Sequence, residues 1–232
     1  MGTHRYSLPI VSGILLALAF YPFYFWPLAF AALAPLFHFA AQTGRRRREL
    51  FFGGFLCGLI GVAPTAYSSL FQMRLLQGDE LFSYLVRASA LPMLALIACA
   101  FGALALSFAL LRSRSWLFNS LIGAALYGAL ELGFMRLLGG YYLPSLSYAV
   151  AGFAPAFTFA SIAGAGFAAL LVAWVNSLVS EAVVAYRVKG HVPLSGIAIA
   201  LACACALYCG AKFYSGALPQ NGPAISAAVV QE

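Results

Sequence analysis

The feature that most restricts the fold of this chain is a series of apolar runs, each near the length that a helix needs to cross a bilayer. About 20 helical residues span the hydrocarbon core. The candidate spans lie at about 6–22, 26–42, 50–72, 82–110, 116–138, 157–185 and 192–214. Only 8% of the residues are charged, against about 25% in soluble domains. The pattern predicts an all-α, polytopic transmembrane helix bundle of about seven spans.

The first two spans meet in the segment "AFYPFYFWPLAF", in which Pro22 and Pro27 stand among aromatic residues. Proline interrupts helices, and Tyr and Trp favour the membrane surface. The segment therefore predicts a tight hairpin, with a single kinked helix as the alternative. A cleavable signal peptide ending near Ala17-Leu18-Ala19 is a further alternative, but the chain stays apolar after Ala19.

The basic residues fall in short gaps between the apolar runs and predict the topology. With the N-terminus inside, nine lie inside and four outside, as the positive-inside rule expects. The inner group is Arg5, Arg45, Arg46, Arg47, Arg48, Arg112, Arg114, Arg187 and Lys189, and the outer group is Arg74, Arg87, Arg136 and Lys212. A single kinked first helix would give eight against five. Both alternatives place the arginine run inside, where it can meet anionic lipid, and the C-terminus outside. This placement explains the net charge of +7 without nucleic-acid binding.

Few polar residues lie within the spans, so each is a candidate for a site. Glu131 is the clearest, and Arg136 lies about 140° around the helix from it, so the two do not share a face. Glu131 either shapes a lipid or substrate cleft or makes a structural hydrogen bond. Glu181, near Arg187, favours a structural role. The five cysteines lie in apolar runs without His or carboxylate partners nearby, so we expect no metal site and no cofactor.

The order of these segments resembles the membrane half of the apolipoprotein N-acyltransferase family. "LLALAFYPFYFWPLAFAALAPL" looks like the opening hairpin of that family. "FFGGFLCGLIGVAPTAYSSL" is similar to its Gly-rich third helix, which ends in a Trp-x-Tyr-x-Ser pattern. The Trp is missing here, and Tyr67 and Ser69 fit the remaining positions.

A second stretch, "ALYGALELGFMRLLGGYYLPSLSYAVAGFAPAF", parallels the family's helix Glu, Arg and following Gly-Phe-Pro-Trp-Leu segment. Glu131, Arg136, Gly140 and Tyr148 keep their places, and Tyr141 stands where the family has Phe. The Pro-Trp and Ser-Gln pairs of the family are missing. The resemblance implies that these residues, with Tyr67 and Ser69, contact lipid or substrate.

The closing "AISAAVVQE" resembles the first strand of the nitrilase-like domain that follows the membrane helices in this family. We therefore expect residues 1–218 to form a seven-helix membrane domain and residues 219–232 a linker and the first strand of a truncated domain. A single strand has no pairing partners, so we expect 225–230 not to join a sheet within this chain.

The resemblance implies that an acyl chain moves from a phospholipid to an enzyme Cys and then to the N-terminal Cys of a diacylated lipoprotein, in the bacterial inner membrane. The Glu, Lys and Cys that catalyse this belong to the nitrilase-like domain, so we expect no catalytic residue in this chain and no activity of the chain alone. Its expected partners are phospholipid and lipoprotein. The alternative function is that of a non-enzymatic transporter or assembly scaffold, for which Glu131 is the one candidate charge.

Overall fold

All the regular secondary structure in the described part of the chain is helical, and no strand is found there. The computed structural model describes residues 5–20, 22–42, 44–76, 80–113, 115–137, 145–150 and 164–190, and residue 198. The elements are α1 (Ser7–Ala19), the 3-10 helix η1 (Trp26–Phe30), α2 (Ala34–Ala41), α3 (Arg47–Leu76), α4 (Glu80–Leu111), α5 (Trp116–Leu137), α6 (Leu146–Ala149) and α8 (Ala165–Lys189). The predicted all-α class is confirmed. The predicted span at 192–214 and the strand at 225–230 lie outside the described residues.

Four helices are long and apolar enough to cross a membrane. Their apolar segments are Arg47–Ser68, Ala90–Leu111, Trp116–Leu137 and Gly166–Val188. They correspond to the third to sixth predicted spans, although α8 begins at Ala165 rather than at 157. At most half of each segment is buried inside the molecule, 39–50%, so the rest can face lipid.

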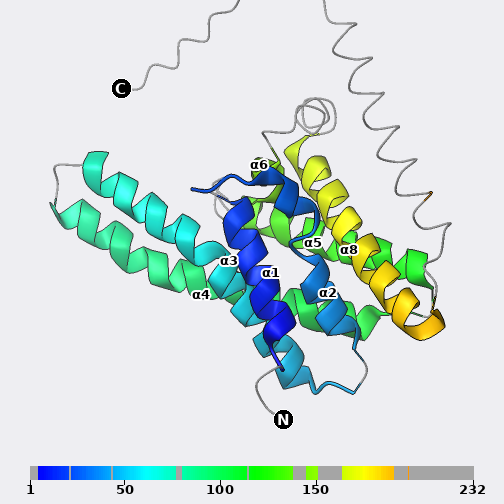
Figure 1. The fold of residues 1–232 in the computed structure, drawn as a ribbon. Coiled ribbons are helices and arrows are strands. Elements are labelled where there is room, and N and C mark those ends of the chain that lie inside the picture. Colours follow the sequence, from blue (N-terminus) through cyan, green and yellow to red (C-terminus); the bar gives the residue numbers. More distant parts are fainter. Residues whose placement is uncertain are drawn as a thin grey trace, which may run out of the picture.

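The two first predicted spans are shorter than expected and form a hairpin. Helix α1 has 13 residues and ends where Phe20 becomes extended, and the turn that follows holds Tyr24 at a positive φ of 52°. Figure 1 shows α1 and α2 side by side and running in opposite directions. The Ser12 hydroxyl donates to the Ala32 carbonyl and joins the two arms. The structure therefore has a hairpin and not a kinked helix, but neither arm is one unbroken helix of about 20 residues.

The second arm is broken between η1 and α2, and Asn176 of α8 closes the break. Pro27 sits in the first turn of η1, where its missing N–H costs nothing. The Asn176 side chain accepts from the backbone N–H of Leu33 and Ala34 and donates to the carbonyl of Ala29. The amide thus satisfies backbone groups that a continuous helix would have satisfied itself.

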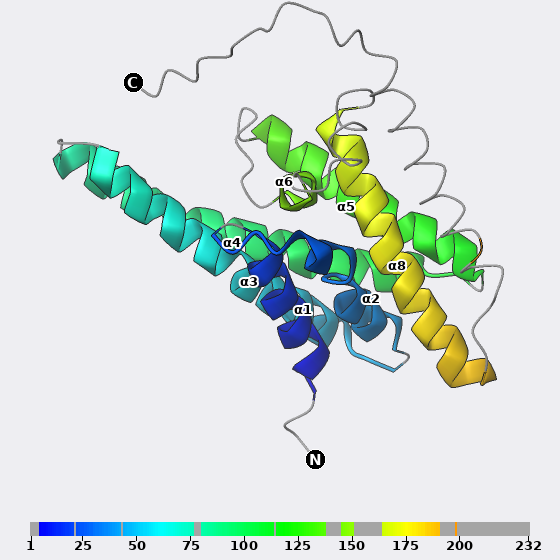
Figure 2. The ribbon, with the colours of Figure 1, turned by 45° about the horizontal axis from the view of Figure 1, so that its top comes forward.

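Helices α3 and α4 form a long hairpin that extends beyond the rest of the bundle (Figures 1 and 2). Glycines let their backbones approach closely. A Cβ at Gly54 would lie 2.8 Å from the Cα of Gly102, and one at Gly58 would lie 3.0 Å from the Cα of Ala98. On another face of α3, the Cys57 carbonyl would lie 2.9 Å from a Cβ at Gly13 of α1. The glycine-rich third span is thus the close-packed centre of α1, α3 and α4.

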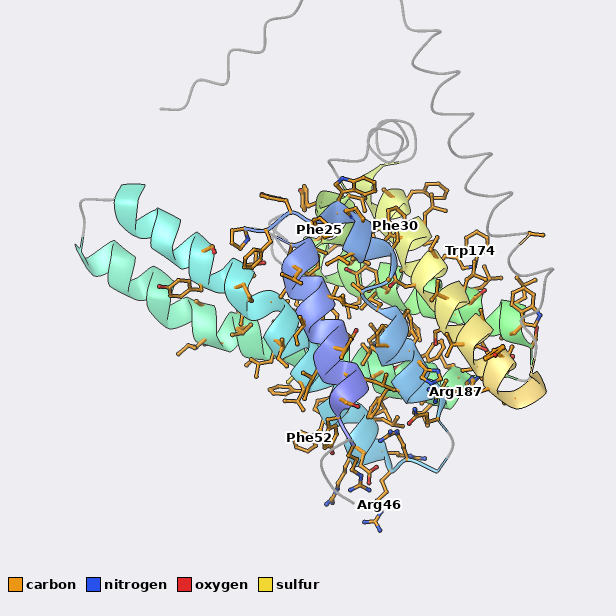
Figure 3. The ribbon with its side chains drawn as sticks, viewed as in Figure 1. Phe25, Phe30, Arg46, Phe52, Trp174 and Arg187 are labelled. Atoms are coloured by element: carbon orange, nitrogen blue, oxygen red, sulfur yellow. The ribbon has the colours of Figure 1, made fainter. Side chains whose placement is uncertain are left out.

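The bundle has two chemically different ends, seen in Figure 3 from the positions of Phe25 and Phe30 at one end and Arg46 at the other. We call the first the aromatic end, where Phe23, Tyr24 and Phe25 are each more than half exposed. We call the second the basic end. Its arginines are Arg5, Arg45, Arg46, Arg47, Arg48, Arg112 and Arg187. These are the described arginines of the predicted inner group, and they gather at one end of the bundle.

Candidate functional site

The structure separates the site residues that the sequence singled out. Glu131 is 1% exposed. Three other singled-out residues are exposed: Arg136 at the end of α5, Tyr148 on α6 and Tyr67 on α3. Gly140 and Tyr141 lie outside the described residues, and Ser69 is described only as part of the α3 backbone. These positions are not brought together into one pocket among the residues that the structure describes.

Instead, Glu131 forms a buried polar cluster with Ser145 and Ser147. The Ser145 hydroxyl donates to Oε1 of Glu131, and the Ser147 hydroxyl lies 3.5 Å from the same oxygen. The two serine hydroxyls are 2.5 Å apart. Tyr127, one helical turn earlier on the same face of α5, also interacts with the carboxyl group. A carboxylate in a membrane helix needs such partners, and here they are hydroxyl groups rather than Arg136.

Local chain chemistry explains why the serines are in place. Ser145 is the N-cap of α6, with an extended backbone and a side chain that accepts from the N–H of Ser147 at 3.1 Å. Leu146, Ala149 and Val150 are buried, and α6 packs against α8 and η1. Glu131 therefore ties the start of α6 to α5 at the aromatic end of the bundle, directly after the segment 138–144.

This arrangement is suited to holding a chain segment rather than to attacking a substrate. The hydroxyls of Ser145 and Ser147 face a carboxyl group without a histidine beside them, so the base–nucleophile–orienter geometry of an acyl transferase is not assembled at this cluster. Of the described cysteines, Cys57 is buried and Cys99 is exposed, and both are free. Within the described ranges no group of three metal-binding side chains is found.

A second buried polar cluster lies at the basic end. Nη2 of Arg112 is 3.2 Å from Oε1 and 3.3 Å from Oε2 of Glu181, and Asn119 Nδ2 donates to Oε2 at 3.2 Å. Nη1 of Arg112 donates at 2.5 Å to the carbonyl of Ala41, the last residue of α2. Glu181, expected near Arg187, is thus paired with Arg112 and links α4, α5 and α8.

Sequence reasoning missed the two serines, Arg112, Asn119 and Asn176. Asn119 and Asn176 are polar residues inside apolar helices, which is itself a signal of internal hydrogen bonding. Ser145 and Ser147 follow a proline in "YLPSLSYA", a pattern typical of a helix start. No signal in the sequence alone pairs them with Glu131.

Residues 12–178 match the family model described as the apolipoprotein N-acyltransferase N-terminal domain. The chain belongs to this family. The match covers most of the chain and confirms the resemblance drawn from the residue patterns. No curated protein matches the chain. With its four long apolar helices, this apolipoprotein N-acyltransferase N-terminal domain is a multi-pass membrane protein.

The family match includes the whole Glu131 cluster and also Asn176, which both lie before residue 178. Glu181 lies just beyond it. The cluster that anchors α6 and the amide that closes the broken second arm therefore both lie within the range matched by the family model.

Proposed function

We propose that this chain is the membrane domain of an apolipoprotein N-acyltransferase-like protein. In this proposal it binds phospholipid and a diacylated lipoprotein, and a nitrilase-like domain carries out acyl transfer on them. The family match over residues 12–178 is the observation that carries the proposal. The protein lies in the bacterial inner membrane with seven spans, with the basic end inside and the aromatic end outside, and takes part in lipoprotein biosynthesis.

Within this proposal, the Glu131 cluster has a positioning role. Glu131 fixes Ser145 at the start of α6. It thereby holds in place the residue that directly follows the segment 138–144 in the sequence. That segment contains Gly140 and Tyr141. Arg136 and Tyr148 flank that segment on either side. Together with Tyr67 and Ser69 on α3, these residues contact lipid or the lipoprotein at the outer face.

The reaction follows the logic of an activated thiol. A Cys thiolate attacks an ester carbonyl of the phospholipid, an acyl thioester forms and the lysophospholipid leaves as an alcohol. The α-amino group of the lipoprotein Cys then attacks the thioester, an amide forms and the thiol is released. The Cys, its base Glu and a Lys are supplied by the nitrilase-like domain. In the proposed division, residues 1–218 are the membrane domain and 219–232 lead into that catalytic domain.

The experiment is an acyl-transfer assay on the purified chain with a phospholipid and a diacylated lipopeptide. We expect binding of the lipopeptide without triacylation. Binding is measured as co-elution of the lipopeptide in detergent, with the Glu131→Ala variant compared against Gly133→Ala on the exposed side of the same helix. Thiol-dependent triacylation by the chain alone, or no binding at all, would contradict the proposal.

A further inference from the structure

Each helix of the α3–α4 hairpin contains one internal proline, Pro64 in α3 and Pro92 in α4. The two helices run antiparallel (Figure 1), and a Cβ at Gly58 of α3 would lie 3.0 Å from the Cα of Ala98 of α4. Six residues further along α3 from Gly58 is Pro64, and six residues back along α4 from Ala98 is Pro92. The two prolines therefore lie at the same height in the hairpin.

This pair of prolines weakens both helices at one height. A proline has no N–H, so the carbonyls of Ile60 and Ala88 do not receive the helical hydrogen bond from the residue four positions later. Sharp bends in helices occur mostly at such positions. A single proline would leave the neighbouring helix with an intact hydrogen-bond ladder, which would resist bending of the pair. Two prolines at the same height give the whole hairpin one bending point.

Packing against the bundle ends at the height of the prolines. On the basic side of them, Val62 of α3 and Ile97 of α4 are each 2% exposed. On the other side, Tyr67 and Leu91 are 72% and 74% exposed. We call residues 65–76 and 80–91 the arm, and Figure 2 shows it extending away from the rest of the bundle. The bundle therefore holds the hairpin up to the bending point and leaves the arm free of it.

Most of the arm also lies beyond the segments that are apolar enough to cross a membrane. These segments end at Ser68 in α3 and begin at Ala90 in α4, whereas α3 continues to Leu76 and α4 begins at Glu80. Bending of the arm therefore needs little rearrangement of the lipid. The 12 residues from Pro64 to Leu76 span about 18 Å, so a bend of about 20° would move the tip of the arm by about 6 Å.

The arm carries one part of the expected substrate site, and the bundle carries the other. Tyr67 lies on the arm. Arg136 and Tyr148 lie on α5 and α6, which both pack against α8. The family resemblance assigns all three residues to contacts with lipid or substrate, but the structure leaves them apart. A bend at the prolines changes the position of Tyr67 relative to the other two without disturbing the bundle.

We propose that the arm bends at Pro64 and Pro92 and closes toward the aromatic end when a diacylated lipoprotein binds there. Closure carries Tyr67 toward Arg136 and Tyr148, so the site is completed around the ligand. The identity of this ligand rests on the proposed function. The bending itself rests only on the paired prolines and on the packing that ends beside them.

The first test measures the bending without a ligand. After the five native cysteines are replaced by serine, spin labels are attached at Leu76→Cys on the arm and Leu137→Cys at the end of α5. Their distance distribution is measured in proteoliposomes by double electron–electron resonance. Restoring both ladders with Pro64→Ala and Pro92→Ala should make the distribution about twofold narrower, because each alanine supplies the missing N–H. Each single substitution should also narrow it, because one intact ladder resists bending.

Two controls belong to this test. Pro35→Ala lies in the first turn of α2, where a proline removes no helical bond, and should leave the distribution unchanged. Labels at Phe52→Cys and Leu137→Cys both lie on the bundle side of the prolines, so their distance should be the same in every variant. If P64A, P92A and the double variant all keep the width of the unmodified chain, the hinge is refuted.

The second test adds a diacylated lipopeptide to the same labelled chain and measures its binding by co-elution. We expect the mean distance between the labels at positions 76 and 137 to shorten by about 6 Å, and by less than about 2 Å when both prolines are replaced. A bound lipopeptide that leaves the distance unchanged would overturn the closure. A lipopeptide that does not bind would refute the proposed function instead, and the first test alone would then decide the hinge.

Discussion

Oδ1 of Asn176, on α8, accepts a hydrogen bond from the backbone N–H of Leu33 at 2.7 Å, across 143 positions of sequence. The contact lies where η1 stops and α2 begins, so the amide replaces the acceptor that the preceding helical turn would have provided. Nδ2 of the same side chain donates to the carbonyls of Ala29 and Val172. A single buried amide therefore makes a broken helix compatible with an apolar environment.

Replacing Asn176 with Leu is expected to destabilise the hairpin. The substitution leaves the Leu33 N–H and the Ala29 carbonyl without their partner, at a cost of about 2–4 kcal/mol for the lost set of bonds. Unfolding in mixtures of mild detergent and SDS measures the change. Val179→Ala, at an exposed position of the same helix, serves as the control and should cost about 0.5 kcal/mol or less. Equal stabilities of the two variants would show that the amide does not support the break.

Close packing of α3 and α4 predicts different effects of the same substitution at two glycines. A Cβ at Gly54 would clash with the Phe101 and Gly102 backbone, which cannot move aside as a flexible side chain can. We expect Gly54→Ala to lower stability by about 1–3 kcal/mol through overpacking. A Cβ at Gly133 would meet no atom within 4 Å, so Gly133→Ala should be neutral or stabilising by up to about 1 kcal/mol. Melting temperatures in detergent check both, and a larger loss for G133A would refute the packing argument.

The Arg112–Glu181 pair predicts an asymmetry between its two members. Removing Arg112 leaves the Glu181 carboxylate, whose side chain is 3% exposed, without its cationic partner. Arg112→Ala should therefore cost about 2–4 kcal/mol, less than for a fully buried pair because Arg112 is itself partly exposed. Glu181→Gln keeps an oxygen that can accept from Asn119 and should cost about 1 kcal/mol. Chemical unfolding of both variants, with Arg48→Ala at an exposed site as control, measures the difference. If E181Q lowers the free energy of unfolding more than R112A does, the unpaired Glu181 charge is not the main penalty.

Positioning by Glu131 predicts faster amide exchange in α6 when the carboxyl group is removed. Glu131→Ala leaves the Ser145 hydroxyl without its acceptor, and exchange over residues 145–150 should rise about tenfold, as for a lost bond of ~1.5 kcal/mol. Glu131→Gln keeps an acceptor oxygen and should stay near the original rate. Hydrogen–deuterium exchange with mass spectrometry reads both. If exchange over residues 145–150 is no faster in E131A than in the unmodified chain, the positioning role is wrong.

Some helices can be predicted from the sequence and others cannot, for physical reasons. The spans of α3, α4, α5 and α8 follow from apolar length alone, because a bilayer core sets that length. The hairpin at Pro22 and Pro27 also follows from local chemistry. Its short α1 and the break before α2 do not, because the compensating group, Asn176, comes from a distant helix.

The candidate site was predicted only in part. A buried carboxylate at Glu131 follows from the cost of charge in a membrane, and its separation from Arg136 follows from helical angle. Its actual partners, Ser145 and Ser147, lie 14 and 16 residues further on, beyond a loop whose path no local rule fixes. In the same way, the nearest basic residue along α8 from Glu181 is Arg187, but tertiary packing selects Arg112.

The central claim, that this chain is a membrane domain serving a nitrilase-like catalytic domain, is tested most directly by a chimera. Residues 1–218 would replace the membrane domain of an active member of the family, and triacylation of a diacylated lipopeptide would be measured in proteoliposomes. We expect thiol-dependent triacylation by the chimera, and a much lower rate when an unrelated multi-span membrane protein carries the same catalytic domain. Equal rates on the two membrane carriers would contradict the claim.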